Sequence, residues 1–182
     1  MKKVLIIFAT REGQTEKVAT RISEHLTSSG ADVLLANAKD KHATDSIDLC
    51  AYDLLVFGAS MHVGGLESEL VEFINANREK IELRDRAFFM VLLSAATKDP
   101  ALKDASLADA RKKMVEQVLI PFDDVEMIAG ALKYSKYPLA LKWVMRRIAR
   151  KSGEDTDMSK DYEYTDWRQV ERYATRLYEM SS

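Results

Sequence analysis

The most informative stretch of this chain is Thr10-Arg11-Glu12-Gly13-Gln14-Thr15. It directly follows residues 4–9, an apolar run that is typical of a buried strand, and it precedes a pattern with helical spacing. A hydroxyl-rich turn that opens a helix at the carboxyl end of a strand offers backbone N–H groups and threonine hydroxyls to a phosphate. This stretch therefore predicts a nucleotide site.

The glycine spacing of this loop excludes two common phosphate-binding loops. A P-loop needs a Lys-Ser/Thr pair after its second glycine, and a dinucleotide-binding loop needs three glycines in the pattern G-x-G-x-x-G. Gly13 is the only glycine here, and neither pattern is present. The pattern that remains, T-x-x-G-x-T, resembles the FMN phosphate loop of flavodoxin-like proteins. The alternative is an ordinary strand-to-helix turn in which Thr15 is the helix N-cap.

Length and composition predict a single domain over residues 1–182, with an insertion at about residues 133–162. The chain is 47% hydrophobic and 31% charged, as in folded domains and unlike disordered chains. Cys50 is the only cysteine and no Cys/His cluster has zinc-ligand spacing, so we expect neither an internal disulfide nor a metal site. No apolar run reaches the roughly 18 residues of a membrane-spanning helix, so we expect a cytoplasmic protein that is neither secreted nor membrane-spanning.

Apolar runs alternate with helical patterns, which predicts βα units around a parallel sheet. Strands are expected at residues 4–9, 32–36, 53–58, 87–93 and 126–131. Helical stripes lie between them, for example Leu107, Met114 and Val118, and the last helix opens with Asp166 and Gln169 in a capping-box-like pattern. The expected fold class is therefore α/β with five parallel strands. The resemblance of the phosphate loop to that of flavodoxin-like proteins implies a flavodoxin-like, doubly wound sheet in the order 2-1-3-4-5. A basic helical insertion separates strand 5 from the last helix.

Two further loops are expected to converge with the first on one crevice. In this strand order a ligand binds at the carboxyl ends of the strands, at the switch point between strands 1 and 3. The loop after the third strand contains Ala59, Ser60, Met61, His62, Val63 and Gly64. The loop after the fourth strand contains Ser94, Ala95, Ala96 and Thr97. Three loops that meet at the switch point favour a flavin site over a simple turn.

Four segments together resemble the flavodoxin-type, menaquinone-dependent protoporphyrinogen oxidases of bacterial haem synthesis. They are the phosphate loop, the A-S-x-x-x-G loop at residues 59–64, the run I-A-G-A-L-K-Y at 128–134, and the stretch 153–167 with G-E-D-T-D and Y-T-D-W. The resemblance implies FMN-dependent oxidation of protoporphyrinogen IX to protoporphyrin IX, with electrons passed to menaquinone or another quinone at the cytoplasmic face of the inner membrane. It also implies that residues 10–15 hold the phosphate and that residues 59–64 and 94–97 flank the isoalloxazine ring.

The second loop departs from two related patterns. Its centre is Met61-His62-Val63, where the resembled family tends to have a basic residue followed by an aromatic one. Electron-shuttling flavodoxins usually surround the flavin with aromatic and acidic residues, and residues 59–65 and 94–98 contain neither type. We therefore expect the reduced flavin to form more easily than in such shuttles. His62 is the one titratable group expected to face flavin or substrate, where it either relays a proton or only packs; no catalytic triad is expected.

A basic segment precedes the last helix. Residues 133–151 hold seven of the 27 Lys and Arg residues and no Asp or Glu, which leaves 20 basic against 29 acidic residues elsewhere. On a helix over residues 139–151 the apolar and basic side chains segregate, as in an anchor at an anionic membrane surface, but also as in a helix packed on its own domain. Propionates of a porphyrin are a further partner for these cations. The expected membrane or substrate contacts are Lys136, Lys142, Trp143, Arg146, Arg147 and Arg150.

Two other functions remain open from the residues. One is a flavodoxin-like electron carrier that docks on partner proteins through its acidic body, and the other is an FMN-dependent quinone or NAD(P)H reductase. Nucleic acid is not an expected partner, because the pI is near 6.0 and the basic segment has no groove-reading motif. An oligomer is possible.

Overall fold

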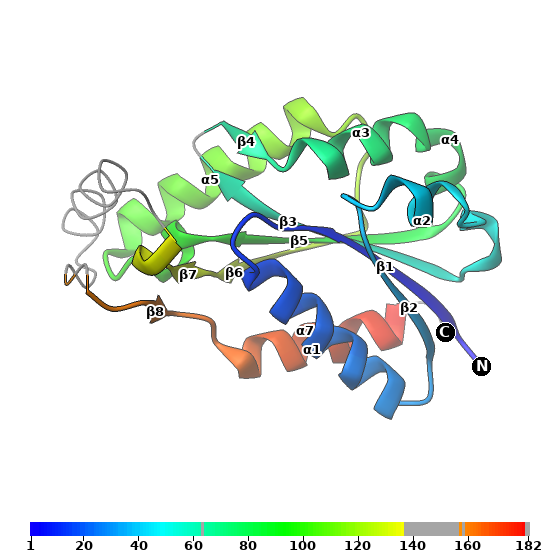
Figure 1. Cartoon of the computed structure of the whole chain (residues 1–182), viewed down its shortest axis with the longest axis horizontal. Coiled ribbons are helices and arrows are strands. Elements are labelled where there is room, and N and C mark those ends of the chain that lie inside the picture. The colour runs from blue at the N-terminus through cyan, green and yellow to red at the C-terminus, as the bar shows by residue number, and fades with distance from the viewer. Residues whose placement is uncertain (63, 137–156, 158, 181–182) are drawn as a thin grey trace.

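The computed structural model describes residues 1–62, 64–136, 157 and 159–180 (Figure 1). In chain order the elements are β1 (Lys3–Ala9), α1 (Gln14–Ser28), β2 (Asp32–Asn37), α2 (Lys41–Asp45), η1 (Leu49–Ala51), β3 (Leu54–His62), β4 (Gly65–Leu66), α3 (Ser68–Ala76), α4 (Arg78–Ile81), β5 (Asp85–Leu92), η2 (Leu93–Ala96), α5 (Pro100–Gln117), β6 (Asp124–Ala129), β7 (Ala131–Leu132), η3 (Tyr134–Lys136), β8 (Tyr162–Glu163) and α7 (Trp167–Met180).

The main sheet has the strand order β2-β1-β3-β5-β6, and all of these neighbours pair in parallel. These are the five expected strands in the expected order 2-1-3-4-5, so the predicted flavodoxin-like sheet is confirmed. β4 is a short antiparallel arm on β3, and β7 and β8 form a separate two-stranded sheet. The switch point therefore lies between β1 and β3, where the chain first turns from one side of the sheet to the other.

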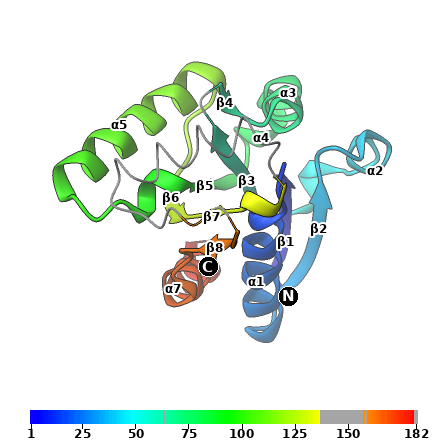
Figure 2. The ribbon, with the colours of Figure 1, turned by 60° about the vertical axis from the view of Figure 1, so that its left-hand side comes forward.

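Helices cover both faces of the sheet. α1 and α7 lie side by side on one face, while α3, α4 and α5 cover the other (Figures 1 and 2). β1 supplies both cores, because successive side chains of a strand point to opposite faces. Leu5 and Ile7 join the core under α3 and α5, whereas Val4 and Ile6 join the core under α1 and α7. Burying each such aliphatic side chain contributes about 1.5–3 kcal/mol.

β3 is longer than the sequence pattern indicates. Its expected end was Gly58, but the strand continues to His62 and turns back, with Met61 opposite Leu66 and His62 opposite Gly65. The segment expected to be a loop is therefore largely the end of a strand in a hairpin, and we call residues 59–62 and 64–67 the hairpin arm. The physical reason is the antiparallel partner, because backbone pairing with β4 carries the strand beyond the edge of the parallel sheet.

The C-terminal part differs from expectation in two details. β6 ends at Ala129, and the expected strand to Ala131 is interrupted at Gly130, whose N–H donates to the Leu92 carbonyl at 3.2 Å. At the start of α7, Asp166 accepts hydrogen bonds from the backbone N–H groups of residues 168 and 169, as predicted. The prediction that Gln169 completes the capping box is wrong, because its side chain donates to the Met127 carbonyl instead of contacting the start of α7.

The predicted basic helix at residues 139–151 lies outside the described residues. Of the expected membrane or substrate contacts, Lys142, Trp143, Arg146, Arg147 and Arg150 share that position, and only the backbone of Lys136 is described, at the end of η3. No helix in the described part of the chain is both long enough and apolar enough to cross a bilayer.

Candidate active site

A cavity of about 500 Å³ lies at the carboxyl ends of β1, β3, β5 and β6. Its position at the switch point is the one that the strand order predicts for a ligand. Segments far apart in the sequence supply its walls: the phosphate loop, the hairpin arm, the start of η2, one face of α5 and the turn between β6 and β7. The lining residues are Thr10, Glu12, Gln14, Thr15, Ser60, Met61, His62, Val91, Leu92, Leu93, Ser94, Leu102, Ala105, Ser106, Asp109, Ala110, Lys113, Gly130 and Ala131.

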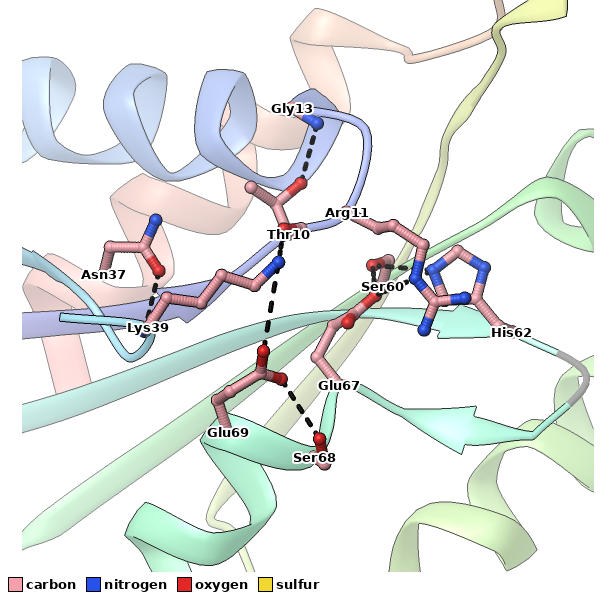
Figure 3. A network of polar contacts seen from close by, with 10 residues as sticks. All are labelled: Thr10, Arg11, Gly13, Asn37, Lys39, Ser60, His62, Glu67, Ser68 and Glu69. Carbon is pink, nitrogen blue, oxygen red and sulfur yellow. Dashed lines mark hydrogen bonds and ion pairs between the residues drawn. The ribbon is translucent and has the colours of Figure 1, made fainter. Parts of the chain in front are cut away.

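The phosphate loop is held in shape by its own backbone and by one lysine. Gly13 is the N-cap of α1 and has a φ of 89°, a left-handed conformation that favours glycine. Its N–H donates to Oγ1 of Thr10 at 2.9 Å. From the other side, Nζ of Lys39 donates to the Thr10 carbonyl at 2.7 Å and lies 4.0 Å from a carboxylate oxygen of Glu69 on α3 (Figure 3). The loop is therefore preformed.

Thr15 provides the fit test for a bound phosphate. The alternative in which Thr15 is a helix N-cap is wrong, because Gly13 is the N-cap and Thr15 lies inside the first turn of α1. The Thr15 side chain is completely buried, and its hydroxyl has no hydrogen-bond partner among the described residues. Buried hydroxyls are nearly always paired, so one at a helix N-terminus that lines a cavity indicates a polar ligand. The residues present fit the phosphate of FMN.

Gln14 fixes the loop against the opposite wall of the cavity. Its Nε2 donates to Oγ1 of Thr165 at 2.9 Å, and the Thr165 hydroxyl donates to the Ala129 carbonyl at 2.7 Å. The side-chain oxygen of Gln14 is buried and has no partner in the described part of the chain. Gln14 therefore holds the end of β6 beside the phosphate loop and offers a second polar atom to a ligand.

A neighbouring ion pair attaches β8 to α1. Nζ of Lys17 lies 2.8 Å from Oε2 of Glu163, and the indole N–H of Trp167 donates to Oε1 of the same carboxylate. The hydrogen bond from Lys17 lowers the pKa of Glu163. Glu163 is therefore ionised at neutral pH. The ion pair links β8, which lies in the 153–167 stretch of the family resemblance, to α1, the helix that follows the phosphate loop.

The hairpin arm carries a buried carboxylate that sequence reasoning missed. Oε1 of Glu67 accepts from the Ser60 hydroxyl at 2.9 Å and lies 2.9 Å from Nε2 of His62 (Figure 3). Nε of Arg11, from the phosphate loop, lies 3.5 Å from the same oxygen. The Glu67 side chain is only 4% exposed, whereas Arg11 is 61% exposed. In sequence, Glu67 precedes Ser68 and Glu69 and is indistinguishable from a solvated acidic helix start.

One face of α5 forms the wall opposite the phosphate loop. Leu102, Ala105, Ser106, Asp109, Ala110 and Lys113 follow helical spacing and all line the cavity. The predicted apolar stripe at Leu107, Met114 and Val118 is confirmed, and it packs on the sheet rather than lining the cavity. Lys113 is the only Lys or Arg that lines the cavity in the residues described, and its Nζ lies 2.9 Å from Oδ2 of Asp109. This wall combines apolar side chains with a hydroxyl and one ion pair.

The predicted cofactor residues divide into three groups. Those that line the cavity are Thr10, Glu12, Gln14, Thr15, Ser60, Met61, His62 and Ser94. Those that are described but do not line it are Arg11, Gly13, Ala59, Gly64, Ala95, Ala96 and Thr97, of which Ala59, Ala95 and Thr97 are buried. Val63 lies outside the described residues. Among the residues that the structure describes, no group of three or more His, Cys, Asp and Glu side chains is arranged to hold a metal ion.

Sequence comparison assigns the family. Residues 5–159 match the flavodoxin domain family, which is well over half of the chain. The chain belongs to the flavodoxin domain family. This membership confirms the predicted fold and the predicted FMN cofactor, whose phosphate the loop at Thr10–Thr15 fits.

Two relatives that match this chain over almost its whole length carry the same name. A protein of Escherichia coli (strain K12) named protoporphyrinogen IX dehydrogenase [quinone] is 31% identical over 175 residues, which are 96% of this chain and 94% of the relative. A protein of the same name from Leishmania major is 27% identical over 95% of this chain and 73% of the relative. The resemblance inferred from the four sequence segments is therefore confirmed.

Solved structures agree on the fold. A short-chain flavodoxin associated with a bacterial microcompartment superposes with a TM-score of 0.58 at 14% identity, and covers 100% of both chains. Oxidised flavodoxin 1 from Bacillus cereus gives a TM-score of 0.55 at 17% identity over 100% of both chains. At such low identities the similarity concerns the backbone architecture alone.

Proposed function

We propose that this flavodoxin domain binds FMN in the cavity at the switch point and oxidises protoporphyrinogen IX to protoporphyrin IX, with a quinone as electron acceptor. The observation that carries the proposal is the buried, unpaired Thr15 hydroxyl at the helix end of a preformed phosphate loop. The substrate and acceptor are those in the name of the relative that is 31% identical over 96% of the chain.

The described residues have distinct tasks in this proposal. Thr10, Thr15 and the N-terminal amides of α1 bind the phosphate. The hairpin arm and the segment 94–97 flank the isoalloxazine ring, and FMN supplies the acceptor for a hydride and its electron pair. Leu102, Ala105 and Ala110 of α5 pack against the substrate, and Lys113 pairs with a substrate carboxylate. His62 lies at the cavity wall, where a proton leaves the substrate.

The direct test is anaerobic mixing of FMN-loaded protein with protoporphyrinogen IX and a menaquinone analogue, followed by porphyrin fluorescence. We expect porphyrin to form faster than in a control with FMN and no protein, and the rate to depend on the quinone. Equal rates would refute the proposed reaction. Oxidation of NAD(P)H by the same preparation would favour the reductase, and no turnover of any donor with rapid electron exchange to partner proteins would favour the carrier.

The basic segment is proposed to bring the enzyme to its quinone. Seven Lys and Arg residues between 133 and 151, with no acidic residue, suit the cytoplasmic face of an anionic inner membrane, because each contributes about 1 kcal/mol near such a surface. Sedimentation with vesicles of phosphatidylglycerol at low salt tests this, with phosphatidylcholine vesicles as the control. Replacement of Lys142, Arg146, Arg147 and Arg150 by Gln should abolish co-sedimentation; equal binding by this variant would refute the anchor.

A further inference from the structure

The buried carboxylate of the hairpin arm, Glu67, does not itself line the cavity at the switch point. Glu67 lies at the N-cap position of α3, where an acidic side chain would ordinarily accept from the helix amides, yet it makes no such hydrogen bond. Its Oε1 is turned instead toward Ser60, His62 and Arg11. The Glu67 carboxylate is only 4% exposed and does not cap the helix. Its buried oxygen is satisfied by these side chains instead.

The hydrogen-bond directions around Glu67 determine the tautomer of His62. An ionised carboxylate only accepts, so both the Ser60 hydroxyl and Nε2 of His62 must donate to it. Oγ of Ser60 lies 3.1 Å from the same Nε2. Because the Ser60 hydroxyl already donates its hydrogen to Glu67, it cannot also donate to the ring. His62 therefore carries its proton on Nε2. Nδ1 is left as a hydrogen-bond acceptor, and it has no partner among the residues described.

We propose that Glu67 is a positioning residue that holds His62 in the Nε2–H form, so that Nδ1 accepts the pyrrole proton of the porphyrinogen. This inference rests on the proposed function. The full reaction removes four bridging C–H hydrogens and two N–H hydrogens in three two-electron oxidations. In the two oxidations that take an N–H hydrogen a bridging C–H bond also breaks, and bound FMN would supply the acceptor for its hydride and electron pair. An N–H bond of the substrate breaks and its proton forms a bond with Nδ1. The carboxylate of Glu67 stabilises the resulting imidazolium through Nε2–H, and the proton then leaves to water.

The electrostatic surroundings of His62 come from three elements. Glu67, at the start of α3, is the carboxylate in contact with the ring. Arg11 approaches the same carboxylate from the phosphate loop, and Glu12 lines the cavity from that loop. Across the cavity, α5 contributes Asp109 and Lys113, which pair with each other. Glu67 is therefore the group best placed to orient His62.

The first test needs no substrate and no variant. In FMN-loaded protein with ¹⁵N-labelled histidine, at a pH where the ring is neutral, nitrogen chemical shifts distinguish the two tautomers of His62. We expect Nε2 to be protonated in the wild type and a mixture of tautomers in Glu67→Gln, in which the amide can donate as well as accept. Protonation on Nδ1 in the wild type would overturn the proposal, whether or not the protein oxidises porphyrinogen.

The second test measures turnover. Glu67→Gln should lower kcat at least about tenfold while the FMN dissociation constant changes less than about twofold, with Glu72→Gln, an exposed carboxylate on the same helix, as the matched control. His62→Ala should lose about a hundredfold in kcat and recover about tenfold with added imidazole. Wild-type kcat in Glu67→Gln, or no imidazole rescue, would overturn the proposal. An inactive wild type would refute the proposed function, and the tautomer measurement would still decide the role of Glu67.

Discussion

The phosphate loop and the hairpin arm line the same cavity but differ in whether their buried polar atoms have hydrogen-bond partners. The loop leaves a buried hydroxyl on Thr15 unpaired, whereas the arm pairs its buried carboxylate with Ser60 and His62. An unpaired buried group costs stability until a ligand satisfies it, while a satisfied network is already stable without one. The loop therefore has a polar atom available for a ligand, whereas the side chains of the arm are already held in place without one.

The largest effect is expected from the arm. Glu67→Ala removes the acceptor of two donors and leaves the Ser60 hydroxyl and His62 Nε2–H without it, so the free energy of unfolding of the apoprotein should fall by about 2–3 kcal/mol. Affinity for FMN should stay within about twofold, because Glu67 does not line the cavity. Urea denaturation and flavin fluorescence titration measure the two quantities. A large loss of FMN affinity with unchanged stability would show that Glu67 serves cofactor binding and not the stability of the hairpin arm.

The loop should respond in the opposite way. Thr15→Ala removes a hydrogen bond to a charged phosphate, so FMN should bind about 2 kcal/mol more weakly, or roughly 30-fold. The apoprotein should be as stable as wild type or slightly more stable, because the missing hydroxyl had no partner. Thermal unfolding without FMN checks the second part. An apoprotein strongly destabilised by Thr15→Ala would mean that the hydroxyl is paired within the protein.

A smaller effect is expected at Gly13. A Cβ at this position meets no heavy atom within 4 Å, so Gly13→Ala costs only the left-handed backbone conformation, about 1 kcal/mol. Because the loop is preformed, the loss should appear equally in denaturation of the apoprotein and of the FMN complex. A loss confined to the complex would show that the loop takes its shape only on binding.

The smallest effect concerns pH. The hydrogen bond from Lys17 lowers the pKa of Glu163 in the folded protein, so its stabilisation is present above the ordinary value of 4.5 and is lost as the pH falls through the lowered value. Lys17→Met should therefore reduce stability slightly at neutral pH and flatten its acid dependence below about pH 4.5. Urea titrations at several pH values compare the two proteins. Parallel curves would exclude a contribution from this ion pair, as is common for exposed pairs.

The sequence predicted the phosphate loop better than the arm, for a physical reason. The loop is local: Thr10, Gly13 and Thr15 lie within six consecutive residues, and their spacing is itself the signal. The arm depends on β3 continuing beyond Gly58 and turning back, which an apolar pattern does not report. The α5 wall was missed for a related reason, because small and polar residues such as Ala105 and Ser106 leave no apolar stripe to read.

Local chemistry sufficed for the alternating strands and helices and for the glycine-containing phosphate turn, because strand burial, helix spacing and turn composition each constrain residues close together in the chain. The strand order and the flavin family followed from the resemblance to flavodoxin-like proteins. The carboxylate beside His62 and the cation on α5 became part of the site only through folding. Glu67 comes five residues after His62 but meets Arg11 from the first βα turn, and Lys113 faces the cavity from a helix more than ninety residues beyond the phosphate loop. Distance in sequence carries no information about such contacts, since they depend on the packing of the sheet that brings the strand ends together.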